Sequence, residues 1–178
     1  MKVLKIVAML ILLFKVGNTQ AQNWKISENY TVAFSNKDVS GVFKEMSGSI
    51  IFDATKLSSS KFDLKIKVES ISTGNGIQNK HAKGDEWFDA DKYPNIEFIS
   101  TKIEKTDAGY KAIGKLEIHG VKKDFSIPFT FSKKGSKGTF VAKFSVDRTE
   151  FGVGKKGNDV AETLKIVATI PATLNKIQ

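Results

Sequence analysis

The chain has 178 residues, a formal net charge of +9 at pH 7 and no cysteine. The lack of cysteine excludes a disulfide framework, a cysteine nucleophile and lipid attachment through an N-terminal cysteine. Only Arg148 among the 28 basic residues is an arginine, which argues against nucleic-acid binding, because specific base and phosphate contacts usually use the bidentate guanidinium group.

Residues 1–21 have the pattern of a secretory signal peptide. Two lysines precede an apolar run over residues 6–14, and a cleavage site with small residues follows at 19–21. The apolar run is shorter than the roughly 20 residues that cross a bilayer, although Lys15 directly after it leaves an uncleaved anchor as the alternative. We therefore expect an exported, periplasmic protein whose single domain spans residues 22–178.

Most of the remaining chain alternates between apolar and polar residues. In residues 61–69, apolar side chains at even positions alternate with lysine, aspartate and glutamate at odd positions, as in a strand with one buried and one solvated face. Short segments rich in glycine, aspartate and serine separate most of these stretches, which indicates an antiparallel meander. The alternation predicts eight strands, over residues 30–36, 45–54, 61–71, 95–105, 109–119, 122–132, 137–148 and 163–174.

One longer segment, residues 75–94, interrupts this pattern between the third and fourth strands. Gly74 tolerates unusual backbone angles, and Asn75 or Thr73 can accept hydrogen bonds from the first amides of a helix. The segment is therefore predicted to form a short helix followed by a loop. The acidic residues between 85 and 91 lack the alternating register of a calcium loop and are interpreted as solvated carboxylates or caps.

The chain shows no recognisable catalytic or metal-binding constellation. His81 and His119 lie 38 residues apart, without the spacing of metal ligands, and are interpreted as structural histidines. Residues 152–157 match the spacing G-x-G-x-x-G of dinucleotide-binding loops, but they join two antiparallel strands rather than a strand and a helix, which favours a flexible turn. We expect neither a cofactor nor an enzymatic activity.

The strand pattern leaves two architectures open. Closing an eight-stranded sheet into a barrel removes its exposed edges, whereas a sandwich would bury the same apolar faces. Barrels of eight strands either fill their interior with side chains or hold one small ligand, and small residues at inward positions favour some internal space. These small residues are Gly48, Ala112, Gly114, Ala142, Ala168 and Ala172. The alternation also points Phe62, Phe98, Phe129 and Phe144 inward and Lys65, Lys67, Lys115 and Lys143 outward.

Several motifs occur in the order found in the YceI family, which the chain resembles over about residues 24–174. They are GVF at 41–43, SG at 47–48, FD at 52–53, WFD at 87–89, YP at 93–94, LEIHGV at 116–121 and FGVG at 151–154. Members of that family are bacterial, usually periplasmic, lipocalin-like barrels that hold a polyisoprenoid or quinone-type lipid. The chain departs from the family pattern at Gln78 and Asn79, where members often carry an arginine-aspartate pair.

The resemblance implies an all-β fold, namely an eight-stranded antiparallel barrel with the insert of residues 75–94 beside one mouth. It also implies that the barrel sequesters or carries a long-chain isoprenoid lipid, with transient contact to a membrane surface. At about 0.3 kcal/mol per heavy atom, a chain on the order of 40 carbons would bind with roughly 12 kcal/mol. A filled barrel that acts in stress response or protein interaction without a ligand is the alternative.

The residues expected to contact this lipid come from the inward faces of the strands and from the insert. Those on the strands are Phe34, Phe52, Phe62, Leu64, Ile66, Phe98, Leu116, Phe125, Phe129, Phe131, Phe140 and Phe144. Trp87 and Phe88 are expected to gate the mouth. The polar head is expected to lie near Asn75, Gln78, Asn79 and His81.

Overall fold

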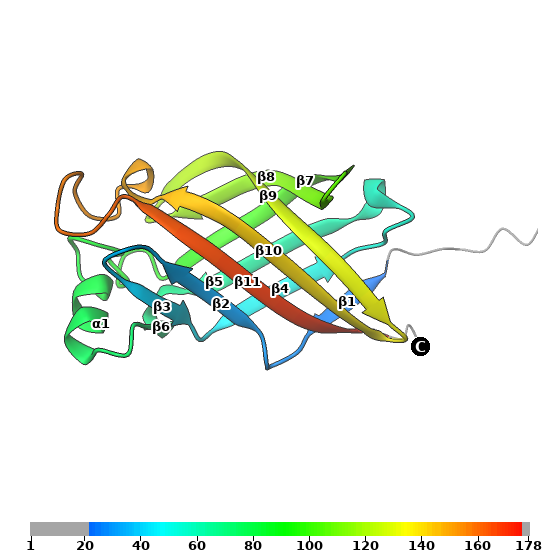
Figure 1. The fold of residues 1–178 in the computed structure, drawn as a ribbon, viewed down its shortest axis with the longest axis horizontal. Helices are drawn as coiled ribbons and strands as arrows, with labels where there is room; N and C mark the ends of the chain where they lie inside the picture. Colours follow the sequence, from blue (N-terminus) through cyan, green and yellow to red (C-terminus); the bar gives the residue numbers. More distant parts are fainter. Residues whose placement is uncertain (1–21, 176–178) are drawn as a thin grey trace, which may run out of the picture.

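The computed structural model describes residues 22–175, in which antiparallel strands close into a barrel with one short α-helix (Figure 1). Eight strands form the ring, and the pairing of β11 with β1 closes it. This closure confirms the predicted eight-stranded barrel and excludes the sandwich. In ring order the strands are β1 (Asn23–Ile26), β4 (Met46–Ile51), β5 (Lys61–Lys67), β7 (Asn95–Thr106), β8 (Gly109–Ile118), β9 (Val121–Lys134), β10 (Lys137–Asp147) and β11 (Thr163–Leu174).

Three further short strands form a branch at one end of the ring. They are β2 (Thr31–Ser35), β3 (Ser40–Phe43) and β6 (Ile71–Ser72), paired in that order outward from β11. The first part of β11 pairs with β2 and its last part pairs with β1. Each branch strand is therefore one half of a bent strand whose other half, β1, β4 or β5, belongs to the ring.

The bends account for the differences from the predicted strands. The Tyr30 hydroxyl donates to the Lys44 carbonyl oxygen at 2.9 Å and accepts from the Met46 amide at 2.6 Å, which fixes two neighbouring bends to each other. The predicted strand 61–71 is interrupted by a 3-10 helix, η2 (Val68–Ser70). The half strands β1 and β3 were not predicted, because four residues are too few for an alternation to stand out.

The insert between β6 and β7 forms the predicted helix and loop. Helix α1 (Gly76–Lys83) begins after Asn75, whose side chain accepts hydrogen bonds from the amides of Ile77 and Gln78. The loop returns to the barrel at Pro94, whose carbonyl oxygen accepts from the Val68 amide at 2.9 Å. Since β6 ends the branch instead of pairing with β7, the insert covers this side of the barrel and α1 stands at its end (Figure 1).

The opposite end of the barrel, which we call the packed end, is filled by the aromatic side chains of Trp24, Phe52, Tyr110 and Phe131. Phe52 is 0% exposed, and its ring centroid lies 4.9 to 6.2 Å from those of five other aromatic residues. The Trp24 indole donates to the Phe52 carbonyl oxygen at 2.9 Å. A Cβ on Gly138 would meet the rings of Trp24 and Phe131 at 2.6 and 2.8 Å. This end therefore has no space for a ligand.

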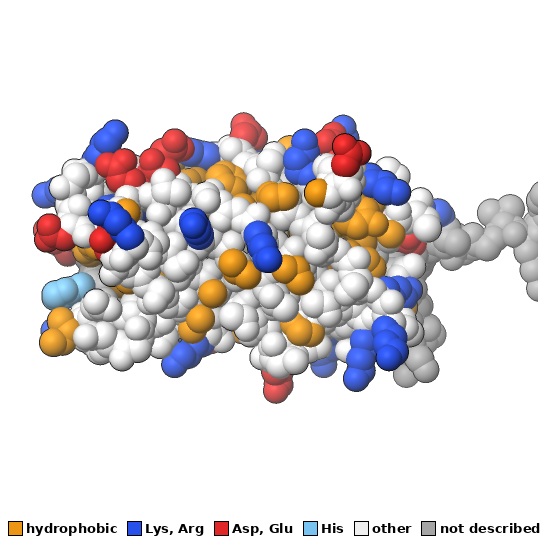
Figure 2. Space-filling view, viewed as in Figure 1, with side chains coloured by type: hydrophobic (Ala, Val, Ile, Leu, Met, Phe, Trp, Pro, Cys, Tyr) orange, Lys and Arg blue, Asp and Glu red, His pale blue; other side chains and the backbone are white. Residues whose placement is uncertain are grey.

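The outer face carries charged side chains spread among the strands (Figure 2). Several of them form cross-strand ion pairs, such as Lys65 with Glu97 at 2.8 Å and Lys122 with Glu117 at 2.8 Å. Exposed pairs of this kind contribute at most about 1 kcal/mol each. The predicted facing is confirmed: Phe62, Phe98 and Phe129 are buried and Phe144 is half-buried inside, whereas Lys65, Lys67, Lys115 and Lys143 are exposed.

Four of the six small inward residues do not provide internal space. A Cβ on Gly114 would lie 2.1 Å from the Ile99 carbonyl oxygen, next to the register shift between Ser100 and Lys102 in β7. Gly48 has a φ of +130°, and a Cβ built there would lie 2.0 Å from the Asp63 carbonyl oxygen. These glycines allow two strands to approach closely. Ala112 and Ala172 are almost fully buried and are not part of the cavity described below.

Two of the short helices lie outside the ring strands, η1 (Leu57–Ser59) and η3 (Arg148–Phe151). No helix within residues 22–175 is long and apolar enough to cross a membrane. The predicted signal peptide, residues 1–21, lies outside the described residues.

Candidate functional site

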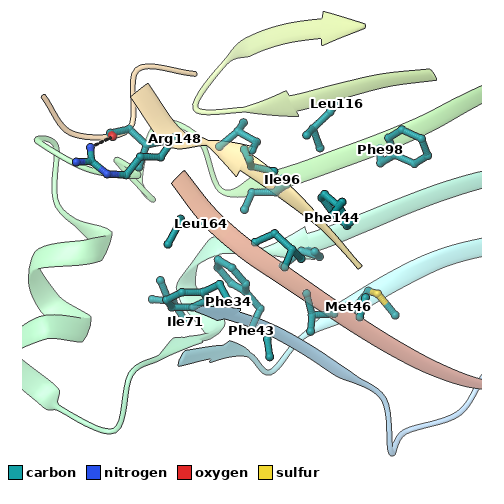
Figure 3. Close-up of a pocket in the computed structure, with 18 of the residues that line it drawn as sticks. Phe34, Phe43, Met46, Ile71, Ile96, Phe98, Leu116, Phe144, Arg148 and Leu164 are labelled. Carbon is teal, nitrogen blue, oxygen red and sulfur yellow. Dashed lines mark hydrogen bonds between the residues drawn. The ribbon is translucent and has the colours of Figure 1, made fainter. Parts of the chain in front are cut away.

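An apolar cavity of about 340 Å³ occupies the half of the barrel next to α1 (Figure 3). Its volume falls at the lower end of the range of small-molecule sites, about 300–1,000 Å³. The barrel is thus filled at one end and hollow at the other. Its lining side chains come from the ring strands, from the branch strands and from the insert.

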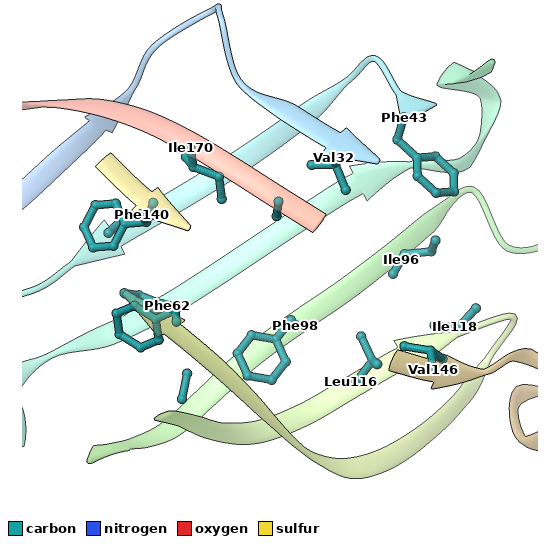
Figure 4. Packing of buried hydrophobic residues seen from close by; sticks show 14 of the residues in the cluster. Val32, Phe43, Phe62, Ile96, Phe98, Leu116, Ile118, Phe140, Val146 and Ile170 are labelled. Atoms are coloured by element: carbon teal, nitrogen blue, oxygen red, sulfur yellow. The ribbon is translucent and has the colours of Figure 1, made fainter. Parts of the chain in front are cut away.

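The bottom of the cavity is a layer of five buried apolar side chains, which we call the floor layer. Phe140 lies opposite Ile170 in the β10–β11 pair, and Ile50 lies opposite Phe62 in the β4–β5 pair. Phe129 completes the layer from β9, with its ring centroid 5.1 Å from that of Phe62. Figure 4 shows Phe62 and Phe140 near one another and far from Phe43, Ile118 and Val146, which lie toward the mouth. The floor layer separates the cavity from the packed end.

The walls of the cavity are apolar and come from facing positions on neighbouring strands. Ala142 and Ala168 lie opposite each other in the β10–β11 pair and contribute only methyl groups to the cavity wall, which leaves internal space beside them. The larger wall residues include Leu64, Ile66, Ile96, Phe98, Leu116, Ile127, Phe144, Leu164 and Ile166.

Polar side chains line the cavity at its mouth. They are Asp38, Thr73, Gln78, His81 and Arg148, contributed by the β2–β3 turn, the insert and η3. An amphiphile in the cavity would therefore place its hydrocarbon against the floor layer and walls and its polar group between α1 and η3. This polarity gradient gives the site one preferred orientation for a ligand.

Arg148 is the most buried polar side chain of the mouth, with 3% of its surface exposed. Its guanidinium donates to the carbonyl oxygens of Val153, Val160 and Ala161 and to the side-chain oxygen of Asn158. These acceptors are neutral and lie in residues 152–162, which we call the mouth loop. Burial lowers the pKa of the Arg148 guanidinium, an effect opposed by the charges of Glu162 and Asp147. Arg148 therefore folds the mouth loop around itself and leaves a positive charge beside the cavity.

The mouth loop is also fixed to the β2–β3 turn. The Ala161 amide donates to the Asp38 carboxylate at 2.7 Å, and the Asn36 side-chain amide donates to the Ala161 carbonyl oxygen at 3.0 Å. The mouth loop and the β2–β3 turn therefore hold each other in place at the mouth.

Trp87 and Phe88 connect the insert to the rest of the mouth. The Arg148 guanidinium carbon lies 5.0 Å from the centroid of the Trp87 ring, a cation–π arrangement. A Cβ on Gly154 would come within 3.0 Å of the same ring, so the mouth loop packs closely against Trp87. Phe88 makes an edge-on contact with Phe43 of β3, at 6.0 Å between ring centroids. Both side chains, which the sequence analysis expected at the mouth, line the cavity.

The structure brings most of the predicted lipid-contacting residues to the cavity and separates three from it. Phe52 and Phe131 belong to the packed end, and Phe125 packs against Phe144 without lining the cavity. The predicted residues that line the cavity are Phe34, Phe62, Leu64, Ile66, Phe98, Leu116, Phe129, Phe140 and Phe144, with Trp87 and Phe88.

The four residues expected near a polar head divide into two pairs. Gln78 and His81 line the mouth. Asn75 is occupied as the cap of α1, and the Asn79 side-chain oxygen accepts from the amide and hydroxyl of Thr73 at 2.7 and 2.9 Å. Asn75 and Asn79 therefore hold the insert in place.

Sequence reasoning missed the role of Arg148. The available signal was that this residue is the single arginine of a lysine-rich chain, and a fixed planar group with five donors suits the enclosure of several carbonyl oxygens. His119 has a φ of +51° and lies 4.5 Å from Tyr93 between ring centroids, outside the cavity lining. Among the described residues no three His, Asp or Glu side chains come together as metal ligands would.

Comparison with known proteins gives a consistent assignment. The family model of the YceI-like domain matches residues 19–172. A UPF0312 protein of Pseudomonas syringae pv. tomato is 28% identical over 92% of this chain and 93% of its own. The crystal structure of BcnA from Burkholderia cenocepacia superposes with a TM-score of 0.76 at 29% identity, covering 81% of this chain and 96% of that one.

A second structure shares the fold at lower identity. The polyisoprenoid binding domain from Saccharophagus degradans, implicated in plant cell wall breakdown, has a TM-score of 0.64 and is 14% identical, covering 88% of this chain and all of that one. At this identity the likeness concerns the fold alone.

Proposed function

The chain belongs to the YceI-like domain family, and from this premise we propose that it is an exported protein that binds an isoprenoid-type lipid in its apolar cavity. The observation that carries the proposal is the division of the cavity into an apolar interior and a polar mouth. The Saccharophagus domain, named as a polyisoprenoid binding domain of the same fold, supplies the ligand class to be tested.

Burial of hydrocarbon is the source of affinity in this proposal. Each CH₂ group transferred from water to the cavity gains about 0.8 kcal/mol, so the lipid needs few polar contacts. Gln78 and His81 would hydrogen-bond the polar head, and the Arg148 charge would favour a head with negative or partial negative charge. Binding and release of the lipid, without a chemical step, are the activity that we propose.

We also propose that the protein works in the periplasm after removal of residues 1–21, and that it meets its lipid at a membrane surface. Ile77 of α1 is 70% exposed, immediately before the cavity-lining Gln78. An exposed apolar side chain at the mouth suits transient insertion between lipid head groups. The lysine-rich surface would favour anionic lipids.

Native mass spectrometry of the protein from periplasmic extracts, followed by organic extraction, tests the proposal. We expect a bound isoprenoid-type lipid, and the intact mass of the protein should correspond to a chain that begins near Gln22. The membrane contact is tested by measuring how fast the same protein takes up an isoprenoid lipid from neutral and from anionic vesicles. We expect faster uptake from the anionic vesicles.

The matched variants are Ala142→Phe and Val167→Phe. Ala142 lines the cavity, whereas Val167 is 39% exposed on the outer face of the next strand. We expect Ala142→Phe to weaken lipid binding about tenfold or more, which corresponds to about 1.4 kcal/mol, and Val167→Phe to leave it unchanged. Protein that carries no lipid, with equal uptake of an added isoprenoid by both variants, would instead favour a ligand-free interaction module.

A further inference from the structure

We propose that Met46 is a site of oxidation to methionine sulfoxide by peroxides, and that this oxidation weakens the binding of apolar molecules in the cavity. Met46 is the only sulfur-containing residue after position 21. The oxidation itself does not depend on the proposed function. Its effect on binding rests on that function, because it requires a cavity that takes up an apolar molecule.

The wall of the barrel is interrupted between β1 and β4. Trp24 of β1 lies opposite Ile50 of β4, and the register of the two strands ends there. Ile26 and Gly48, which would be the next pair of inward residues, do not pair with each other. A groove, which we call the side groove, opens at this place. It is lined by residues 23–28, 30, 44, 46–49 and 175.

Met46 separates the side groove from the cavity. Among the described residues it is the only one that lines both. The next inward position on β4 is Gly48, where the Asp63 carbonyl oxygen leaves no room for a side chain. The half-buried side chain of Met46 therefore closes the interrupted part of the wall, and Figure 3 shows it far from Arg148 at the mouth. A methionine suits this position because its unbranched side chain adapts to irregular gaps.

The backbone around Met46 is fixed, so its side chain is the part that can move. The Met46 amide donates to the Tyr30 hydroxyl at 2.6 Å, and that hydroxyl donates to the Lys44 carbonyl oxygen. On the other side of β4, Met46 pairs with Ile66 of β5. Gly48 is exposed although it lies at an inward position, so solvent enters the wall beside Met46. A small polar oxidant therefore has a path through the side groove to Met46 while the barrel stays folded.

The chemistry needs only a peroxide. A lone pair of the thioether sulfur attacks one oxygen of hydrogen peroxide, so that an S–O bond forms as the O–O bond breaks. The departing hydroxide takes the proton of the transferred oxygen, and the products are methionine sulfoxide and water. The sulfur is thereby oxidised by two electrons and the peroxide is reduced by two. The side chain that results is polar, whereas the thioether was apolar.

The sulfoxide is disfavoured in the apolar wall, because a buried oxygen without a hydrogen-bond donor loses its hydration. In the side groove, water and the hydroxyl groups of the exposed residues Ser47 and Ser49 can donate to it. The oxidised side chain should therefore turn toward the groove and leave the wall open beside Gly48. An open wall leaves part of a bound apolar molecule in contact with water, so less of its surface is buried and its affinity falls.

The first experiment measures how fast hydrogen peroxide oxidises Met46 in the folded mature chain, by intact mass and peptide mapping. We expect a gain of one oxygen at Met46, at a rate within about tenfold of that of free methionine. The matched control is the double variant Met46→Leu/Leu116→Met, since Leu116 lines the cavity but not the side groove. Its methionine should be oxidised at least about tenfold more slowly. Equal rates at the two positions would overturn the route through the side groove.

The second experiment measures the dissociation constant of N-phenylnaphthylamine, an uncharged apolar dye, by its fluorescence before and after peroxide treatment. We expect oxidation to raise the dissociation constant of the wild-type chain about tenfold, which corresponds to about 1.4 kcal/mol. Met46→Leu removes the sulfur and keeps an apolar side chain of similar volume, so peroxide should leave its dissociation constant as it was before treatment. Met46→Gln places a polar amide at the same site and should bind the dye more weakly without any peroxide.

The outcomes separate this inference from the proposed function. Oxidation of Met46 with no change in dye affinity, in a chain that binds the dye, would overturn the inference and leave the proposed function intact. A loss of affinity that also occurs in peroxide-treated Met46→Leu would overturn the role of Met46, since another residue would then carry the damage. An untreated chain that binds neither the dye nor farnesol would overturn the effect on binding together with the proposed function.

Discussion

The two ends of this barrel share the long ring strands and the same alternation, yet one is filled and the other is hollow. At the packed end, Trp24 of β1 and Phe52 close the interior. Because Gly138 has no Cβ, the rings of Trp24 and Phe131 pack directly against its backbone. At the cavity end, the bent strands form a branch that ends at β6, and an insert takes the place of a continuous wall. Alternation thus decides which side chains face inward. The course of the strands decides whether those side chains contact one another and fill the interior or leave a cavity.

The strongest way to test this comparison is to remove a ring from each end. Phe52→Ala should lower the free energy of unfolding by about 3–5 kcal/mol, because it leaves a void among aromatic neighbours that cannot close it. Phe144→Ala should cost clearly less, because one side of that half-buried ring already faces the cavity. Urea unfolding of both variants measures the difference. Equal costs would mean that the two ends are packed alike.

Adding a methyl group at each end tests the same difference in packing. Gly138→Ala places a Cβ at 2.6 Å from the Trp24 ring and 2.8 Å from the Phe131 ring, and this overpacking should cost about 1–3 kcal/mol. Gly76→Ala is the matched control at the mouth, since nothing lies within 4 Å of its added Cβ. In α1 it should stabilise by up to about 1 kcal/mol. Thermal unfolding of the two variants measures whether Gly138→Ala lowers stability and Gly76→Ala raises it. A Gly138→Ala variant as stable as wild type would show that the packed end is loosely packed.

The smallest expected effect concerns one carboxylate at each end. Hydrogen bonds from Thr55 lower the pKa of Asp53 beside the packed end, and hydrogen bonds from Thr149 lower the pKa of Asp147 beside the mouth. Because the folded-state pKa lies below the ordinary value of 3.8, each contribution is present above that pH and is lost as the pH falls through the lower, folded-state pKa.

Asn replacements separate the charge from the hydrogen bonds. The Asn side-chain oxygen can accept the same backbone hydrogen bonds as an Asp carboxylate at a cap. Asp53→Asn and Asp147→Asn should therefore each lower the free energy of unfolding at neutral pH by only on the order of a few tenths of a kcal/mol. Both should make the loss of stability below about pH 4 shallower, as unfolding titrations at several pH values would reveal. An unchanged acid profile in both variants would mean that other carboxylates dominate acid unfolding.

Much of the fold and part of the site could be predicted from the sequence. Eight of the strand positions followed from alternation alone, and the insert followed from the capping residues around Asn75. Closure into a barrel came from the family resemblance, because period two is the same in a sandwich. Gln78, His81, Trp87 and Phe88 were expected at the mouth, and the structure has them lining it.

What the sequence by itself determined is the side of the sheet on which each residue lies, because successive residues of a strand point to opposite faces whatever their neighbours are. Only the tertiary structure decided that Phe52 and Phe131 fill the packed end while Phe98 and Phe144 line a cavity. It also decided that Arg148 gathers the carbonyl oxygens of the mouth loop around one guanidinium. The physical reason is that internal space depends on side-chain volumes summed across eight strands and on where those strands bend. Neither quantity is local in the chain, whereas the direction of a side chain is.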